Sequence, residues 1–255
     1  MAIRDFREAT EWHQLLERVP LIQPPAGIWL GSGPSTGGLT KHTAPWFDDR
    51  YEVAVCANKS HYAWHRIARW CERTRWIYLC PEEANVDCDW FWEVPLKFLK
   101  LFSFTRTKDV VDKLTSLYGD DPERLEAEEA RHIAIRLSHH ASGLNPSEYG
   151  DGLHAGTPDV TGHLRGTVTL QALHLLGILG CKRIDAYGCE LAFTKGEPVH
   201  FYDTGYVEEW AVSPGTVYNH WKESAAYIRS LKRDFEQRGI EVRYRCKTLI
   251  TGETV

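Results

Sequence analysis

Short apolar runs alternate with amphipathic stretches along most of the chain. The runs have the length of buried strands and end at polar or turn-forming residues, and they cover residues 28–30, 52–58, 76–80, 183–188 and 240–246. The pattern predicts helices over residues 5–18, 60–73, 107–118, 121–140, 166–180 and about 215–238. Strands that alternate with helices predict an α/β fold with a mostly parallel sheet and helices on both faces.

Three stretches interrupt this pattern. Residues 90–106 are rich in aromatic side chains without a clean period, and residues 192–213 read as an excursion from the fold. Residues 139–165 are rich in Gly, His, Pro, Asp and Ser, and so long an aperiodic segment is usually a functional lid or disordered. No repeat or linker divides the chain. We therefore expect a single domain over residues 1–255, with a lid-like segment at about 139–165.

The first predicted strand leads directly into a loop of small residues. This loop consists of glycines, hydroxyl-bearing residues and one proline, in the order Gly31, Ser32, Gly33, Pro34, Ser35, Thr36, Gly37 and Gly38. Glycines allow a backbone to approach phosphate oxygens closely, and hydroxyls can donate to them. The spacing differs from G-x-G-x-x-G, and no Walker A triplet follows. The loop is a candidate phosphate cradle; the alternative is a strand-to-helix turn that binds nothing.

Charge and cysteine content narrow the class of protein. A net charge of −5 argues against a general binder of nucleic acid or anionic membranes. The seven cysteines form no C-x-x-C pair, and those at 56, 80, 189 and 246 lie in or beside apolar runs, which favours a reducing cytoplasm. No apolar stretch approaches 18 residues, and the amino terminus is charged where a signal peptide is apolar. We expect a cytoplasmic protein without a membrane span.

Several landmarks resemble one superfamily when they are taken in order. They are Gly31-Ser-Gly33-Pro-Ser35 after the first strand, Cys56-Ala-Asn58 at the end of the second, the helical segment from Thr167 to Ile184, Gly188-Cys189-Glu190 after a later strand, and His200 downstream. The chain is similar to the bacterial sialyltransferases of glycosyltransferase family 42. It is also similar to the related MptE-like group, which holds 6-hydroxymethylpterin diphosphokinases and motility-associated glycosyltransferases.

The resemblance implies a Rossmann-like sheet with a nucleotide across the carboxyl ends of the first two strands. It implies a nucleotide-sugar donor, with a CMP-sugar favoured, and single displacement onto a small-molecule or saccharide acceptor without a required metal. The residues implied to bind the nucleotide are Gly31, Ser32, Gly33, Pro34, Ser35 and Asn58, with Thr167 and Thr169 approaching it. His200 is the implied general base, and an imidazole with a pKa near 6.5 suits removal of a hydroxyl proton.

Other functions stay open from the sequence. The family usually has Asp where Glu190 stands, and its catalytic tyrosines have no clear counterparts here. An ATP-dependent diphosphokinase acting on a pterin-like heterocycle would use magnesium, for which Asp87 and Asp89 are candidate ligands. A non-catalytic nucleotide-binding module would keep the cradle alone. The Trp and Arg residues between Trp64 and Trp76 leave a nucleic-acid acceptor open, although aromatic residues at helical spacing favour a core role.

Overall fold

The structure is a computed structural model of the 255-residue chain. It describes residues 4–6, 26–42, 44–80, 83–103, 106–135, 168–191, 200–202, 225, 228–229, 235–248 and 250–251. The whole of the expected lid-like segment and Thr167 therefore lie outside the described residues. Most of the excursion at 192–213 and of the helix at about 215–238 lie outside them as well.

An eight-stranded sheet with only parallel pairs organises the described residues. Its strands are β1 (Arg4–Phe6), β2 (Ala26–Leu30), β3 (Val53–Ala57), β4 (Arg75–Cys80), β5 (Phe98–Ser103), β6 (His132–Ile135), β7 (Arg183–Tyr187) and β8 (Glu241–Tyr244). The order across the sheet is β1-β6-β5-β4-β3-β2-β7-β8. From β2 the chain moves outward to β6 and then returns to the other side of β2. The order reverses between β2 and β7, where α/β sheets open a crevice at the carboxyl ends of their strands.

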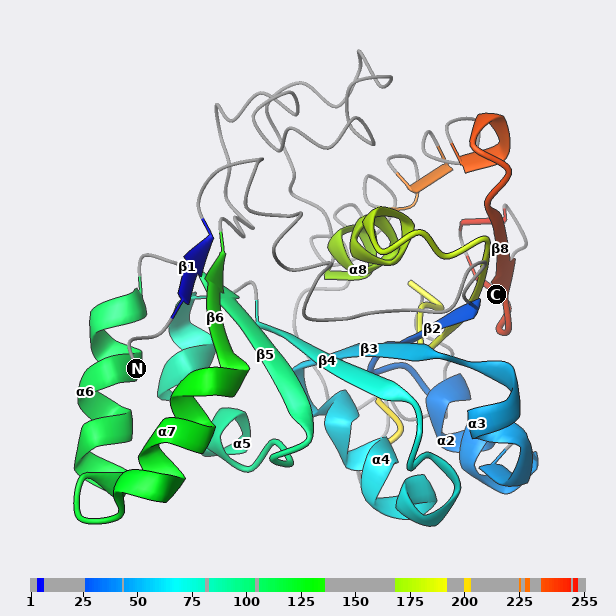
Figure 1. The fold of residues 1–255 in the computed structure, drawn as a ribbon. Helices are drawn as coiled ribbons and strands as arrows, with labels where there is room; N and C mark the ends of the chain where they lie inside the picture. The colour runs from blue at the N-terminus through cyan, green and yellow to red at the C-terminus, as the bar shows by residue number, and fades with distance from the viewer. Residues whose placement is uncertain are drawn as a thin grey trace, which may run out of the picture.

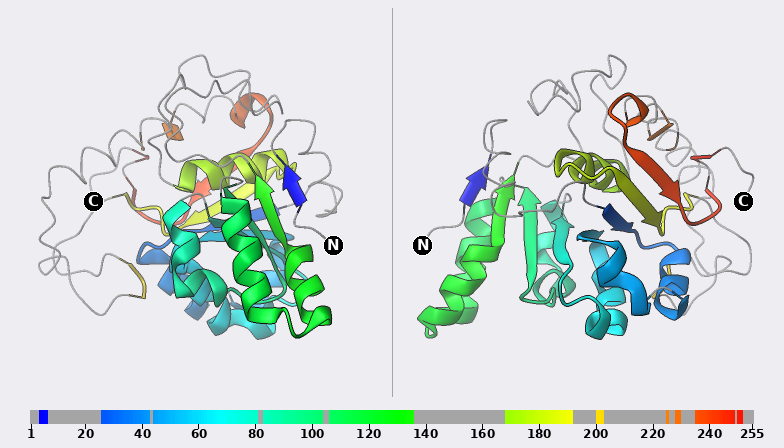
Figure 2. Two further views of the ribbon diagram at one scale, coloured as in Figure 1. Left: turned by 90° about the vertical axis from the view of Figure 1, so that its left-hand side faces the viewer. Right: turned by 45° about the vertical axis from the view of Figure 1, so that its right-hand side comes forward.

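Helices cover both faces of the sheet, as the sequence predicted (Figures 1 and 2). One face carries α2 (Ser35–His42), α3 (Phe47–Arg50), α4 (Tyr62–Ile67), α5 (Asp89–Trp92), α6 (Thr107–Tyr118) and α7 (Pro122–Arg131). The other face carries α8 (Val168–Ile178). Short 3-10 segments are η1 (Ala44–Trp46), η2 (Asn58–His61), η3 (Ala68–Trp70) and η4 (Glu83–Asp87). The α/β Rossmann-like fold class is thereby confirmed.

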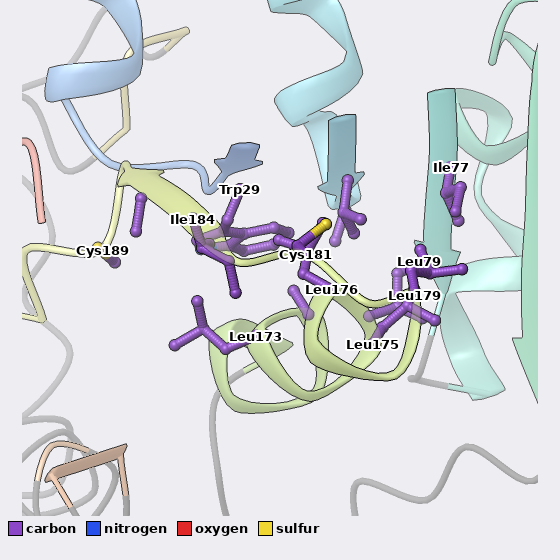
Figure 3. Packing of buried hydrophobic residues seen from close by; sticks show 14 of the residues in the cluster. Trp29, Ile77, Leu79, Leu173, Leu175, Leu176, Leu179, Cys181, Ile184 and Cys189 are labelled. Atoms are coloured by element: carbon purple, nitrogen blue, oxygen red, sulfur yellow. The ribbon is translucent and has the colours of Figure 1, made fainter. Parts of the chain in front are cut away.

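The two faces bury different kinds of side chain. Under α8 the core is mainly aliphatic, with Leu173 and Leu176 packed near Ile184 of β7 (Figure 3). The opposite core is aromatic, and the ring of Trp76 stacks between Phe47 and Phe98 at centroid distances of 5.6 and 4.9 Å. Helix and strand residues form each core, and the central strands contribute side chains to both, which explains why those strands read as continuous apolar runs.

The structure corrects three predicted elements. The helix predicted over 121–140 ends at Arg131, and His132–Ile135 form β6 instead. A strand, β5, lies within the aromatic stretch 90–106 that gave no period. Residues 5 and 6, predicted to begin a helix, belong to β1.

The reason for the second correction is Lys100, a charged residue in the middle of β5. Its ammonium group is buried, where it donates to Phe91 O at 2.7 Å and lies 5.4 Å from the Trp92 ring centroid. Tertiary contacts therefore stabilise a lysine that breaks the apolar pattern of the strand.

No helix in the described parts of the chain is long and apolar enough to cross a membrane.

Candidate functional site

The candidate site lies at the crevice where the strand order reverses, and two loops build its floor. The loop after β2 and the loop after β7 are joined by backbone hydrogen bonds, from Gly31 N to Tyr187 O at 2.9 Å and from Gly33 N to Gly188 O at 3.1 Å. These bonds extend the pairing of β2 with β7 beyond the last strand residues. The glycine-rich loop is thereby fixed against its neighbour.

The glycines of these loops are required by close packing. A Cβ atom on Gly31 would overlap the carbonyl of Gly188, and a Cβ on Gly33 would overlap the Glu190 carboxylate. Gly188 itself has a φ of +67°, and a Cβ there would overlap the backbone of Gly31. The two loops can therefore approach each other only because these positions lack side chains.

The amino terminus of α2 is already occupied by a carboxylate. Ser35 N donates to Glu190 Oε1 at 2.8 Å. The Glu190 carboxylate therefore takes the position in which the start of a helix would otherwise bind an external anion. Gly188 N donates to Ser35 Oγ at 2.7 Å, and Thr36 Oγ1 donates to Gly31 O at 2.8 Å. Several donors proposed for phosphate binding thus hold the loops together. The Glu190 Oε2 atom is buried and has no hydrogen-bond partner among the described residues.

Ser32 is the exception within the loop. Its carbonyl accepts from Phe201 N at 3.0 Å, whereas its amide and hydroxyl have no hydrogen bond to any described residue. Pro34 has no amide hydrogen to offer. Ser32 is therefore the loop residue whose donors are left for a ligand.

The bond from Phe201 to Ser32 brings residues 200–202 onto the glycine-rich loop. The ring of His200 stacks on Tyr202 with centroids 5.1 Å apart and planes 3° apart. Tyr202 in turn meets the edge of Tyr62 at 6.3 Å, and Lys59 Nζ lies 5.8 Å from the Tyr202 ring centroid. The candidate base is thus held between the loop after β2 and the segment after β3.

Asn58 stands at the carboxyl end of β3 in a conformation that few residues other than glycine adopt, with a φ of 51°. Asn85 Nδ2 donates to Asn58 Oδ1 at 3.0 Å, which orients the Asn58 amide so that its Nδ2 is the group left to donate. Asparagine enters this left-handed region more readily than most residues other than glycine, so the turn after β3 suits this residue type. The structure therefore presents Asn58 as a positioned donor at the rim of the crevice.

Two buried aromatic groups lie beneath Asn58. His61 Nδ1 bonds with Asn58 O at 2.9 Å, and burial lowers the pKa of His61 to about 4. Its Nε2 atom and the Tyr78 hydroxyl have no hydrogen-bond partner among the described residues. Because its pKa is about 4, His61 is a neutral imidazole at pH 7.

The nearby Tyr62 hydroxyl is also perturbed. Burial raises its pKa to about 12, with a contribution from its hydrogen bond to Glu93.

The remaining predicted site residues lie elsewhere. Thr169 is buried on α8, where its hydroxyl accepts from Trp29 Nε1 at 3.2 Å, so this group supports the core. Asp87, the first carboxylate of the D-x-D pair, bonds with Arg106 Nη2 at 2.6 Å. Among the described residues, no three His, Cys, Asp or Glu side chains are placed to hold a metal ion together.

Sequence reasoning missed the residues that orient the site. Asn85 carried no motif, and only the packing of η4 against β4 and β5 brings it to Asn58. Lys59 follows Asn58 directly and Tyr202 lies two positions after His200, and this closeness in sequence was the available signal. Comparisons with protein-family models, curated proteins and solved structures found no match for this chain.

Proposed function

We propose that this protein is a glycosyltransferase that transfers a sugar from a nucleotide-activated donor, a CMP-sugar by preference, to an acceptor hydroxyl. The observation that carries the proposal is the hydrogen bond from Phe201 N to Ser32 O, which holds His200 beside the crevice. The crevice is the place where open α/β sheets bind nucleotides. A titratable base next to a nucleotide site supports group transfer to a hydroxyl.

The groups around the crevice suit the leaving phosphate of such a donor. Ser32 offers an amide and a hydroxyl, Asn58 offers an oriented amide, and the half-buried Lys59 supplies a positive charge. Hydrogen-bond donors and a cation placed where negative charge develops lower the barrier for its departure. His200 would take the proton of the acceptor hydroxyl as it attacks the sugar carbon, so no covalent intermediate is needed.

A single phosphate suits this site better than a triphosphate. Glu190 places a carboxylate at the start of α2, and its charge disfavours a chain of phosphates there. The few donors left at Ser32 and Asn58 match the needs of one phosphodiester. This supports the CMP-sugar over the ATP-dependent diphosphokinase, for which Asp87 is already paired with Arg106.

A thermal-shift panel tests the ligand class. CMP, CDP, CTP, UDP, GDP, ADP and ATP are each added with and without magnesium, and a ligand at 100 times its Kd stabilises the folded state by about 2.7 kcal/mol. We expect a shift with CMP that needs no metal, that shrinks in Asn58→Ala and that persists in Ser116→Ala, an exposed control on α6. A magnesium-dependent shift with ATP alone would support the diphosphokinase. No shift with any nucleotide would overturn the nucleotide site.

The second test concerns His200. With labelled CMP-sialic acid and a panel of saccharide and small-metabolite hydroxyl acceptors, His200→Ala should lower turnover by roughly 10²- to 10⁴-fold. The Kd for CMP should stay within a few-fold of the wild-type value, because the base contacts the acceptor. Turnover in His200→Ala close to that of the wild type would refute the assigned base. Binding of CMP without turnover on any acceptor would support a nucleotide-binding module instead.

A further inference from the structure

Two cysteines far apart in the sequence meet behind the glycine-rich loop. Cys189 follows β7 and is buried, whereas Cys246 follows β8 and is half-buried. Their Sγ atoms lie 3.7 Å apart. Every cysteine of the chain is a free thiol in the structure. Among the described residues, no third Cys, His, Asp or Glu completes a metal site with this pair.

Hydrogen bonds on both sides hold the segments that carry these thiols. Arg245 N donates to Ala186 O at 2.8 Å, and Thr248 Oγ1 donates to Cys189 O at 2.6 Å. The backbone is thus fixed just before and just after Cys246. A disulfide requires an Sγ–Sγ distance of about 2.05 Å, and rotation of the two side chains can shorten the present distance of 3.7 Å.

The two thiols are inequivalent. Their mutual hydrogen bond lowers the pKa of Cys246 and raises the pKa of Cys189, and the Ser35 side chain also favours the Cys246 thiolate. Because Cys246 is the more exposed of the two, a reagent from solvent reaches the better nucleophile first. Burial instead raises the pKa values of Cys56, Cys71 and Cys181, which makes those thiols unreactive.

We propose that Cys189 and Cys246 are a thiol-disulfide modification site that responds to low-molecular-weight disulfides such as oxidised glutathione. The Cys246 thiolate attacks one sulfur of the reagent, forms a mixed disulfide and releases one thiolate. The Cys189 thiol then attacks the Cys246 sulfur, loses its proton to solvent and releases the second thiolate. One intrachain disulfide forms, two protein thiols are oxidised and one glutathione disulfide is reduced to two thiols.

The pair is connected to the candidate site through one residue. Glu190 follows Cys189 directly, and its carboxylate accepts from Ser35 N at the start of α2. The Glu190 charge also raises the pKa of the Cys189 thiol, so the thiol pair and the anion position of the glycine-rich loop share this residue. The disulfide chemistry itself does not depend on the proposed nucleotide function.

Titration with oxidised glutathione, followed by alkylation and peptide mapping, tests this site. In the wild type we expect a disulfide that links the Cys189 and Cys246 peptides and reverses with a dithiol reductant. Cys189→Ser should stop at a mixed disulfide of glutathione on Cys246. Cys246→Ser should form neither product. Cys88→Ser, which removes another half-buried cysteine, should behave as the wild type does.

Rates measured on the wild type guard against variants that fold poorly. Alkylation at Cys246 should be at least about tenfold faster than at Cys88, because thiolate character and exposure control the rate. A wild-type map without a Cys189–Cys246 disulfide, or one in which Cys88 takes the glutathione, overturns the proposal. If the disulfide forms but no nucleotide binds, the redox site stands and the glycosyltransferase proposal falls.

Discussion

The two parts of the crevice use their polar groups in opposite ways. In the paired loops after β2 and β7, amides, hydroxyls and the Glu190 carboxylate bond with one another, and glycines make that closeness possible. In the cluster formed by residues 58–62 and 200–202, Asn58 and Lys59 present donors at the rim while His61 is buried below them. The polar groups of the most conspicuous sequence motif therefore serve mainly to hold the two loops together, and we call these paired loops the platform.

The largest effect is expected where the platform tolerates no side chain. Gly188→Ala places a Cβ at a positive φ and against the backbone of Gly31, which should lower the free energy of unfolding by about 3 kcal/mol or more. Gly38→Ala is the matched control, because it adds a Cβ to exposed space on α2 and should raise stability by about 0.5–1 kcal/mol. Urea denaturation measures both. A loss under 1 kcal/mol in Gly188→Ala would show that the loops can separate.

The second-largest effect is a pH dependence of stability that the buried imidazole of His61 gives to the cluster. The unfolded chain binds a proton on His61 near pH 6.5, whereas the folded chain resists protonation until about pH 4. Stability from this group is therefore full above pH 6.5 and falls as the pH drops toward 4, by about 2 kcal/mol between pH 7 and pH 5.

The measurement is urea denaturation at both pH values. His61→Gln should lose that part of the pH dependence, whereas the exposed control His65→Gln should retain it. Burial also lowers the pKa of His132, so the wild type keeps a larger slope than His61 alone would give, and the comparison between variants isolates His61. Equal slopes in all three proteins would mean that folding does not lower the pKa of His61.

The sequence predicted the elements whose contacts follow directly from local pattern. Strands β2, β3, β4 and β7 are apolar runs, and α6 was predicted with the bounds that the structure has. Prediction from the sequence failed where tertiary contacts override the local pattern. The helical spacing of Leu125 and Ile133 continues past the end of α7, but Ile133 pairs with Leu101 in the sheet. Lys100 is predicted from sequence as a surface residue, but in the structure its ammonium group is buried and donates to the Phe91 carbonyl.

The site shows the same limit more sharply. The glycine-rich loop, Asn58 and His200 were each proposed from sequence; the loop follows β2, Asn58 follows the neighbouring strand β3, and the segment of His200 bonds with the loop through Phe201. The sequence could not show that Glu190 fills the start of α2, because that contact exists only once β7 is inserted beside β2. The Cys189–Cys246 pair, 57 residues apart, depends in the same way on the pairing of β7 with β8.

A smaller effect should separate orientation from direct binding within the cluster. Asn85→Ala removes the donor that orients Asn58, so CMP affinity should fall about fivefold, equivalent to about 1 kcal/mol. Calorimetry gives the Kd values. Asn58→Ala should weaken binding at least as much, and the double variant should be no weaker than Asn58→Ala alone, because Asn85 acts through Asn58. Additive losses would show that Asn85 contacts the ligand itself.

The smallest change in stability is expected at Ser32, and it tests the comparison most directly. Ser32→Ala removes a hydroxyl that bonds with no described residue, so the free energy of unfolding should stay within about 0.5 kcal/mol of wild type while CMP binds more weakly. Thr36→Val, four residues on, removes the buried donor to Gly31 O and should cost about 1–3 kcal/mol of stability with little direct effect on CMP. The opposite result, a loss of stability in Ser32→Ala and a loss of CMP binding in Thr36→Val, would contradict this assignment. Thr36 would then face the ligand, and the bonds from Gly31 and Gly33 to the loop after β7 would have to break.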